Sequence, residues 1–250
     1  MRKNEKVSII GHRGFSSRHA GNSMWAFRAA LEAGVDAVET DLRESCDGVL
    51  LCAHYPFHVS SVPRNPFTNP FVSGSTSQTL EKLGYVPFSD LLDFVRGQDI
   101  RILCDLKVRE PQFPRRVLDQ VGKSNVDTAQ IILGVRNMAQ MEHRGPAKTL
   151  GFLPYKDMRE FFNRQGDIFR VWEKNVPRLN VDGEKGVLPQ GRIWVMTKML
   201  GITGKSTQER LSVIYKNPRV TGILLNDVGL IVDNKPALDS ARAEILANTF

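Results

Sequence analysis

The sequence predicts a closed α/β barrel, and three observations carry this prediction. Eight short apolar runs, each typical of a buried strand, recur along the chain. Helical patterns separate them, as expected of βα units that build a parallel sheet. The length of 250 residues accommodates eight such units, so we predict a TIM (β/α)8 barrel formed by a single domain, residues 1–250. A doubly wound open sheet is the alternative, but neither a Gly-x-Gly-x-x-Gly nor a Walker loop follows the first run.

The predicted strands and helices alternate in order. The strands are Val7 to Arg13, Ala37 to Leu42, Arg101 to Lys107, Gln130 to Val135, Leu150 to Pro154, Ile168 to Glu173, Arg192 to Thr197 and Gly222 to Asp227. The helices are Met24 to Ala33 with Asn22-Ser23 as the cap, Asp90 to Arg96 with Ser89 as the cap, Pro114 to Val121 ending at Gly122, Asp157 to Gln165 ending at Gly166, and Ser206 to Lys216.

Two segments interrupt the alternation. Val49 to His54 reads as an extra strand, joined to the second strand by a hairpin through Asp47-Gly48. The following residues 55–84 are polar, rich in Pro, Ser, Thr and Asn, and show no helical period. Long loops inside compact domains are usually functional, so we expect this excursion to be a lid or a substrate-facing loop.

Composition excludes several classes of protein. The chain is 41% hydrophobic and 24% charged, and no apolar run approaches the length of a membrane span, so we expect no stable membrane anchor and a cytoplasmic location. The net charge of +7 serves solubility or attracts an anionic partner. No dense Lys/Arg block is interleaved with aromatic residues, so we expect no nucleic-acid partner. Oligomeric state is left open.

Polar residues gather where predicted strands end, which is where parallel barrels place their chemistry. His12 and Arg13 end the first strand, and Glu39 and Asp41 lie two residues apart on the second, so their carboxylates share a face. Two such carboxylates need a cation or a shared proton, and their oxygens suit Mg²⁺ or Ca²⁺.

The third strand and the added strand complete the candidate site. Asp105 and Lys107 repeat the two-residue spacing on the third strand. They are either an ion pair or a third metal ligand and a phosphate contact. His54 ends the added strand and would pair with His12 for acid–base chemistry near neutral pH. Trp194 and Glu173 are candidates for the pocket, although a Trp in such a strand is often core.

These motifs resemble the glycerophosphodiester phosphodiesterase family. The resembling residues are His12-Arg13-Gly14, Asn22-Ser23, Ala26-Phe27, Glu39-Thr40-Asp41, Asp47-Gly48, His54, Val86-Pro87-Phe88-Ser89, Asp105-Leu106-Lys107, Trp194 and Gly222 to Asp227. The resemblance implies a barrel that holds a divalent cation through Glu39, Asp41 and Asp105. It also implies His12 and His54 as the acid–base pair, with Arg13 and Lys107 binding phosphate.

The resemblance implies a metal-dependent phosphodiesterase that cleaves a small-molecule glycerophosphodiester to a glycerol 3-phosphate type of monoester and an alcohol. Three positions depart from the family pattern: Gly21 replaces a Glu, Tyr55 an Asp and Asp105 a Glu. Because these departures change the pocket, a sugar phosphodiester of the agrocinopine type or a lysophospholipid are alternative substrates. A non-catalytic protein that binds a phosphorylated ligand is the alternative of another class.

Overall fold

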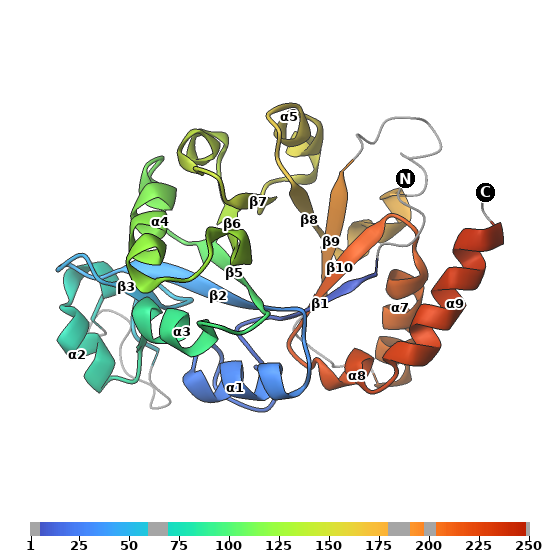
Figure 1. Ribbon diagram of the computed structural model, residues 1–250, viewed down its shortest axis with the longest axis horizontal. Coiled ribbons are helices and arrows are strands. Elements are labelled where there is room, and N and C mark those ends of the chain that lie inside the picture. Colours follow the sequence, from blue (N-terminus) through green and yellow to red (C-terminus); the bar gives the residue numbers. More distant parts are fainter. Residues whose placement is uncertain (1–5, 60–69, 180–190, 198–203, 249–250) are drawn as a thin grey trace.

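Eight parallel strands form a closed barrel in the computed structural model, which describes residues 6–59, 70–179, 191–197 and 204–248. The strands are β1 (Ser8–Gly11), β2 (Ala37–Glu44), β5 (Arg101–Leu106), β6 (Ile131–Val135), β7 (Lys148–Gly151), β8 (Ile168–Trp172), β9 (Arg192–Met196) and β10 (Val220–Leu225). Each pairs with its neighbour in parallel, and β1 pairs with both β10 and β2, which closes the barrel (Figure 1). The predicted TIM barrel and its eight strands are confirmed.

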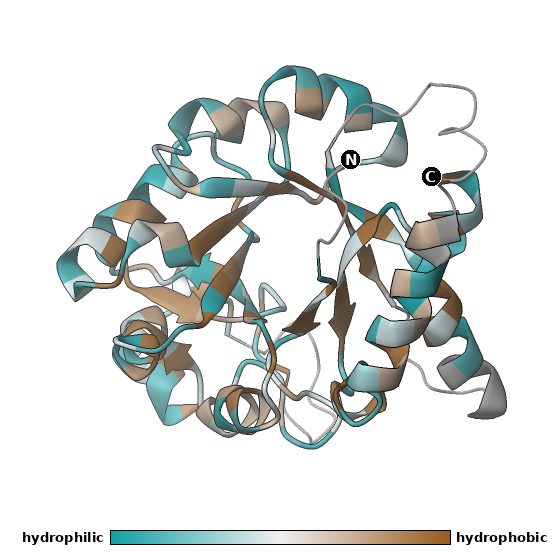
Figure 2. Cartoon of the chain, turned by 45° about the vertical axis from the view of Figure 1, so that its right-hand side comes forward, coloured by the Kyte–Doolittle hydropathy of each residue, from teal (hydrophilic) through white to brown (hydrophobic). Residues whose placement is uncertain are grey.

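Helices surround this barrel (Figure 2). The described α-helices are α1 (Met24–Glu32), α2 (Ser77–Lys82), α3 (Phe88–Val95), α4 (Phe113–Ser124), α5 (Met158–Asn163), α7 (Gly204–Lys216), α8 (Gly229–Val232) and α9 (Lys235–Asn248). Short 3-10 helices are η1 (Val72–Gly74), η2 (Thr128–Gln130), η3 (Met138–His143), η4 (Tyr155–Asp157) and η5 (Glu173–Asn175). Among the described residues, no helix has the length and apolarity needed to cross a membrane.

The strands are apolar on both faces, which explains why they read as continuous apolar runs. Their outward side chains join the helices in the main core, and a second cluster of buried side chains fills the barrel interior. Trp194 on β9 belongs to that interior cluster and is 1% exposed. A Cβ on Gly222 of the neighbouring β10 would lie 2.6 Å from the Trp194 ring, so the ring occupies the space that this glycine leaves.

Helix positions were predicted better than helix ends. Ser23 caps α1 as predicted, since its Oγ accepts a hydrogen bond from the Ala26 amide at 3.2 Å. Ser89 does not cap α3, which begins at Phe88. The helix predicted to end at Gly122 continues to Ser124, and Asn125 ends it in the left-handed conformation with φ +59°. The helix expected over Asp157 to Gln165 spans Met158–Asn163 and follows η4, while α8 and α9 were not predicted.

The predicted hairpin is present and brings His54 back alongside Asp41 of β2. Strand β3 (Leu50–Cys52) pairs antiparallel with β2, and the short β4 (Val86–Pro87) extends this sheet. Gly48 provides the positive φ of the turn, +78°. Beyond β3, the Ala53 amide donates to the Asp41 carbonyl at 2.8 Å, so the chain remains attached to β2 as it reaches His54.

The excursion over residues 55–84 is more regular than expected. Its beginning is joined to its middle, because the Val72 amide donates to the Pro56 carbonyl at 2.8 Å and Phe57 bridges Phe71. It also contains η1 and α2, which corrects the prediction of a segment without helix. The Thr76 side chain caps α2. Residues 60–69 lie outside the described part of the chain, so the predicted lid remains a proposal.

Candidate active site

Three buried carboxylates meet at the carboxyl ends of β2 and β5. Glu39 and Asp41 share a face of β2, and Asp41 lies opposite Asp105 in the register of β5. One oxygen from each residue lies within 4.8 Å of the other two, and the three residues are at most 3% exposed. The structure therefore brings together the three residues that were predicted as metal ligands.

Two cationic side chains balance part of this charge. Lys107 Nζ lies 2.7 Å from Asp41 Oδ1 and 2.7 Å from Asp105 Oδ2. Arg136, the residue after β6, donates from Nε to Asp105 Oδ1 at 2.7 Å and contacts Oδ2 through Nη2. Lys107 is thus an ion-pair partner of the predicted ligands, and Arg136 is a site residue that the sequence analysis missed.

The pKa values of Glu39 and Asp41 are shifted in opposite directions. Burial raises the pKa of Glu39 well above its usual value, and the nearby charges of Asp41 and Asp105 raise it further. Burial also opposes ionisation of Asp41, but its hydrogen bond with His54 and the charge of Lys107 hold the pKa of Asp41 well below its usual range. The cluster therefore combines one stable anion with one carboxyl that tends to keep a proton.

The cluster suits a divalent cation. Glu39 Oε1 is buried and has no hydrogen-bond partner among the described residues. A buried acceptor without a partner is costly, and a cation would satisfy it. Carboxylate oxygens are hard ligands of the kind that Mg²⁺ and Ca²⁺ prefer.

Asn22 positions Asp41. Its side-chain Nδ2 donates to Asp41 Oδ2 at 2.9 Å, and its Oδ1 accepts from the Thr40 hydroxyl at 3.0 Å. Asn22 has φ +62°, a left-handed conformation that asparagine tolerates better than most residues. The sequence analysis gave Asn22 as part of a helix cap and of the family resemblance, and it assigned no contact with Asp41 to this residue.

His12 is held beside Glu39. His12 Nδ1 lies 2.7 Å from Asn226 Oδ1, and its Nε2 lies 3.8 Å from Glu39 Oε2. Burial is the main reason that the pKa of His12 falls to about 4, and the charge of Arg13 lowers it as well. The imidazole is therefore neutral at neutral pH. Asn226, which follows β10, was also missed, because only the closed barrel places it next to β1.

His54 lies on the other side of the cluster. Its Nδ1 is 3.0 Å from Asp41 Oδ2, and about a third of its side chain, 32%, is exposed. Tyr55 packs edge-on against the ring with centroids 4.7 Å apart. Arg43 of β2 donates to the His54 carbonyl at 3.1 Å through Nη2, which fixes the backbone that carries the imidazole.

Arg13 contributes both backbone and side chain. Its amide donates to Glu39 Oε2 at 2.8 Å, and its φ of +56° turns the chain sharply after β1. Its side chain lines a cavity of about 280 Å³ together with Asn22, His54 and Tyr55. A Cβ added to Gly21 would lie 3.1 Å from Arg13 Cβ, so the loop packs closely against this arginine.

Two predicted pocket residues lie elsewhere. Trp194 is buried in the barrel interior, so it is part of the core and does not form the wall of an open pocket. Glu173 lies in η5 and forms an ion pair with Arg210 of α7, so this carboxylate already has a cationic partner outside the acidic cluster. Neither residue is brought to the three carboxylates.

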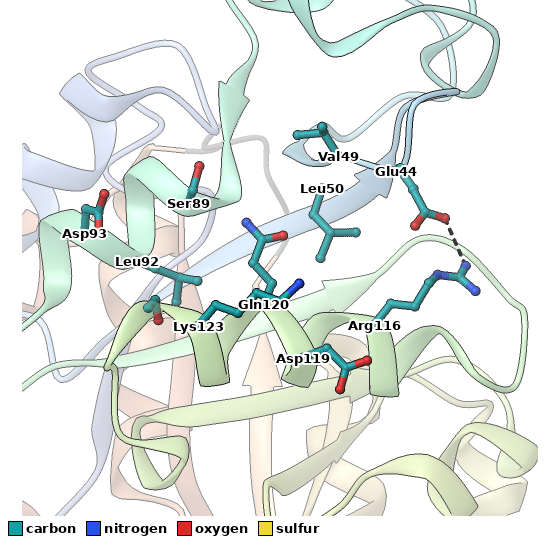
Figure 3. A pocket seen from close by; sticks show the side chains of 12 residues that line it. Glu44, Val49, Leu50, Ser89, Leu92, Asp93, Arg116, Asp119, Gln120 and Lys123 are labelled. Atoms are coloured by element: carbon teal, nitrogen blue, oxygen red, sulfur yellow. Dashed lines mark ion pairs between the residues drawn. The ribbon is translucent and has the colours of Figure 1, made fainter.

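The cavities separate into those near the cluster and one away from it. The cavity with Arg13 and His54 adjoins the β2 side, and a second, of about 550 Å³, includes Arg136 and lies over β6 to β8. A third, of about 620 Å³, lies between α3, α4 and the β2–β3 hairpin and is bordered by the Glu44–Arg116 ion pair of 3.0 Å (Figure 3). It contains none of the candidate residues, so its volume does not mark the site.

The barrel and its mouth define the class of enzymes whose active sites lie at the carboxyl ends of barrel strands. Residues 12–141, just over half of the chain, match the Glycerophosphoryl diester phosphodiesterase family. The chain belongs to this family, a group of hydrolases that act on phosphoric diesters.

Individual relatives are distant. A glycerophosphodiester phosphodiesterase of Caldanaerobacter subterraneus subsp. tengcongensis is 33% identical over 31% of this chain, and the uncharacterized protein YqiK of Bacillus subtilis is 24% identical over 50% of it. The alignments span only 30% and 57% of those two relatives. A phosphodiesterase of Oleispira antarctica, solved with the product sn-glycerol 3-phosphate, has TM-score 0.74 at 10% identity, over 93% of this chain and 97% of its own. This likeness shows the fold.

Proposed function

We propose that the protein is a metal-dependent phosphodiesterase that hydrolyses a glycerophosphodiester-like substrate to a phosphomonoester, of the glycerol 3-phosphate type, and an alcohol. The observation that carries the proposal is the cluster of Glu39, Asp41 and Asp105, within 4.8 Å of one another, with an imidazole on each side. Family membership and the Oleispira antarctica structure with its glycerol phosphate product support the same reaction.

The three carboxylates are the proposed ligands of Mg²⁺ or Ca²⁺. When bound, such a cation supplies charge that stabilises a phosphodiester and its more highly charged transition state. With Lys107 and Arg136, the three ionised carboxylates leave one net negative charge. A divalent cation changes this to one positive charge, which matches the single negative charge of a phosphodiester.

Lys107 and Arg13 are the proposed phosphate contacts. In the structure the Lys107 ammonium pairs with Asp41 and Asp105. A cation on those carboxylates would take over this pairing and release the ammonium for a phosphate oxygen. Arg13 lines the cavity beside His54, where its guanidinium can bind phosphate in a bidentate way.

The two histidines are the proposed acid–base pair. His12 is neutral, and its Nδ1 donates to the side-chain oxygen Oδ1 of Asn226, so Nε2 carries the lone pair that can accept a proton. Asp41 Oδ2 accepts from His54 Nδ1, which leaves Nε2 as the ring nitrogen that can exchange a proton with the substrate. One imidazole takes the proton of the nucleophile and the other gives a proton to the leaving alkoxide. The nucleophile is water or a neighbouring substrate hydroxyl, and the latter gives a cyclic phosphate that water then opens.

A panel of phosphodiesters tests the proposal. We expect the wild-type protein with Mg²⁺ or Ca²⁺ to release alcohol from a glycerophosphodiester, with the products identified by mass spectrometry. His12→Ala should lower turnover by a factor of at least about 100, as expected for loss of an acid–base group. The matched control is His19→Ala, since His19 is exposed. Full activity in His12→Ala, or no turnover of any diester by the wild type, would contradict the proposal.

A further inference from the structure

The cavity over β6 to β8 is rich in guanidinium groups. It has a volume of about 550 Å³, and its lining includes Arg109, Arg136 and Arg170 together with a single carboxylate, Asp157. Arg136 also binds Asp105, so the cavity begins at the acidic cluster. A substrate whose phosphate lies at that cluster can therefore extend one of its two alcohol groups into this cavity.

Arg170 differs from the other two arginines: Arg109 is exposed and Arg136 pairs with Asp105, whereas Arg170 is partly buried. Ile168 of β8 faces the barrel interior, and Arg170, two residues further on, shares that face. Among the described residues, Arg170 forms no salt bridge, and its buried Nε has no hydrogen-bond acceptor. Burial is the main reason that the pKa of its guanidinium falls to about 10; the charge of Asp105 opposes this shift and that of Arg136 adds to it, and the group stays charged at neutral pH. A buried cation of this kind is stabilised by an anion.

The aromatic side chains of the cavity are already covered by arginines. The Arg170 guanidinium lies 4.5 Å from the centroid of the Trp172 ring and 5.3 Å from that of Phe152. The Arg136 guanidinium also lies over Phe152, at 5.3 Å. A quaternary ammonium or an amine needs an aromatic face or a carboxylate. Here three guanidinium groups outnumber the one carboxylate, Asp157, and two of them cover these rings, so the lining disfavours cationic alcohols such as choline and ethanolamine.

We propose that this cavity binds the leaving alcohol of the substrate through an anionic group on that alcohol, a phosphate or a carboxylate, held by Arg170 and Arg109. The inference rests on the proposed function, because it assigns the alcohol side of the same diester. Phe152, Arg170 and Trp172 lie beyond residues 12–141, the segment that matches the family. The preferred substrate then carries at least two negative charges.

The test compares diesters that differ only in the charge of the alcohol. Glycerophosphoinositol is paired with its 4-phosphate, glycerophosphoglycerol with glycerophosphoglycerate, and glycerophosphocholine is the cationic probe. We expect the wild-type kcat/KM to be at least about tenfold higher for an anionic member than for its neutral partner, since a charge-assisted contact contributes about that factor. The pair with the larger ratio identifies phosphate or carboxylate as the group.

The variants locate the effect. Arg170→Gln should reduce the ratio of kcat/KM between anionic and neutral diesters toward one, whereas Arg115→Gln, on an exposed arginine of α4, should preserve the wild-type ratio. If Arg170→Gln does not fold, Arg109→Gln decides, because Arg109 is an exposed residue on the same cavity. An unchanged ratio in the folded cavity variants, or a wild-type preference for neutral or choline diesters, would overturn the inference.

Failure of the proposed function gives a different result. If the wild type hydrolyses none of the diesters, the proposed phosphodiesterase activity is wrong. The affinities of the same intact diesters, measured by calorimetry, then still test the anionic subsite. Binding that is tighter for the anionic member, and weakened by Arg170→Gln, supports the anionic subsite. Equal affinity for both members of each pair overturns it.

Discussion

His54 Nδ1 lies 3.0 Å from Asp41 Oδ2, and this contact joins the segment that follows β3 to the acidic cluster of Glu39, Asp41 and Asp105. The same oxygen accepts from Asn22 Nδ2 at 2.9 Å, while Oδ1 faces the Lys107 ammonium at 2.7 Å. The two oxygens of one carboxylate thus have separate partners: Oδ2 contacts His54 and Asn22, and Oδ1 contacts the Lys107 ammonium. Asp41 therefore holds the His54 imidazole and the Lys107 ammonium next to each other.

Removal of the Asn22 side chain should destabilise the protein and misplace Asp41. Asn22→Ala leaves Asp41 Oδ2 with one partner fewer, places alanine at φ +62°, and should cost about 2–3 kcal/mol of unfolding free energy. Asn125→Ala is the matched control, since Asn125 is exposed and also left-handed, at φ +59°. We expect the control to lose only about 1 kcal/mol. Equal losses in urea unfolding would show that the contacts with Asp41 contribute nothing.

The buried His12 should make stability depend on pH in the acidic range. Burial lowers the pKa of His12 from 6.5 to about 4 in the folded chain, so the unfolded chain binds the extra proton between these values. This contribution to stability is complete above pH 6.5 and is lost as the pH falls toward 4. Between pH 7 and pH 5 the wild type should lose about 2 kcal/mol more than His12→Gln.

Urea unfolding at both pH values measures this difference, and comparison with the variant cancels the contributions of other carboxyl groups to first order. Parallel pH dependence in the two proteins would mean that His12 is not held in its neutral form.

Cation binding should release a proton from Glu39. Burial, with the charges of Asp41 and Asp105, raises the pKa of Glu39, so a bound cation must displace the proton that the free carboxyl retains. The affinity for Mg²⁺ or Ca²⁺ should therefore rise with pH, by up to about tenfold per pH unit while Glu39 remains protonated. Calorimetry in buffers of different ionisation enthalpy detects the released proton. A binding enthalpy that is the same in every buffer contradicts this account, and Glu39→Gln should abolish the buffer dependence.

The barrel could be predicted because its signal is local. Strands of a parallel barrel are buried on both faces, so β5 and β6 read directly as apolar runs. Helix ends depend on weaker preferences. Gly122 suggested a stop, yet it is exposed with no atom near its missing Cβ, so α4 passes through it and ends three residues later at Asn125. Similarly, α3 begins at Phe88 because the preceding Pro87 is extended, with ψ 140°.

The candidate site was predictable where its residues share a strand. The two-residue spacing of Glu39 with Asp41, and of Asp105 with Lys107, places each pair on one face before the fold is known. Arg136, Asn226 and Asn22 were missed because their contacts join elements that are distant in sequence. The His12–Asn226 contact spans 214 residues and requires the barrel to close between β1 and β10.

Dependence of hydrolysis on a divalent cation is the most direct test of the central claim. Glycerophosphodiester turnover would be measured after chelation with EDTA and during titration with Mg²⁺ or Ca²⁺, for the wild type, Asp41→Asn and the control Asp119→Asn, whose side chain is exposed on α4. We predict that chelation abolishes turnover, that one of the cations restores it in the wild type and in Asp119→Asn, and that Asp41→Asn, still folded by thermal denaturation, does not respond. Full turnover in EDTA, or wild-type turnover by Asp41→Asn, would contradict the account.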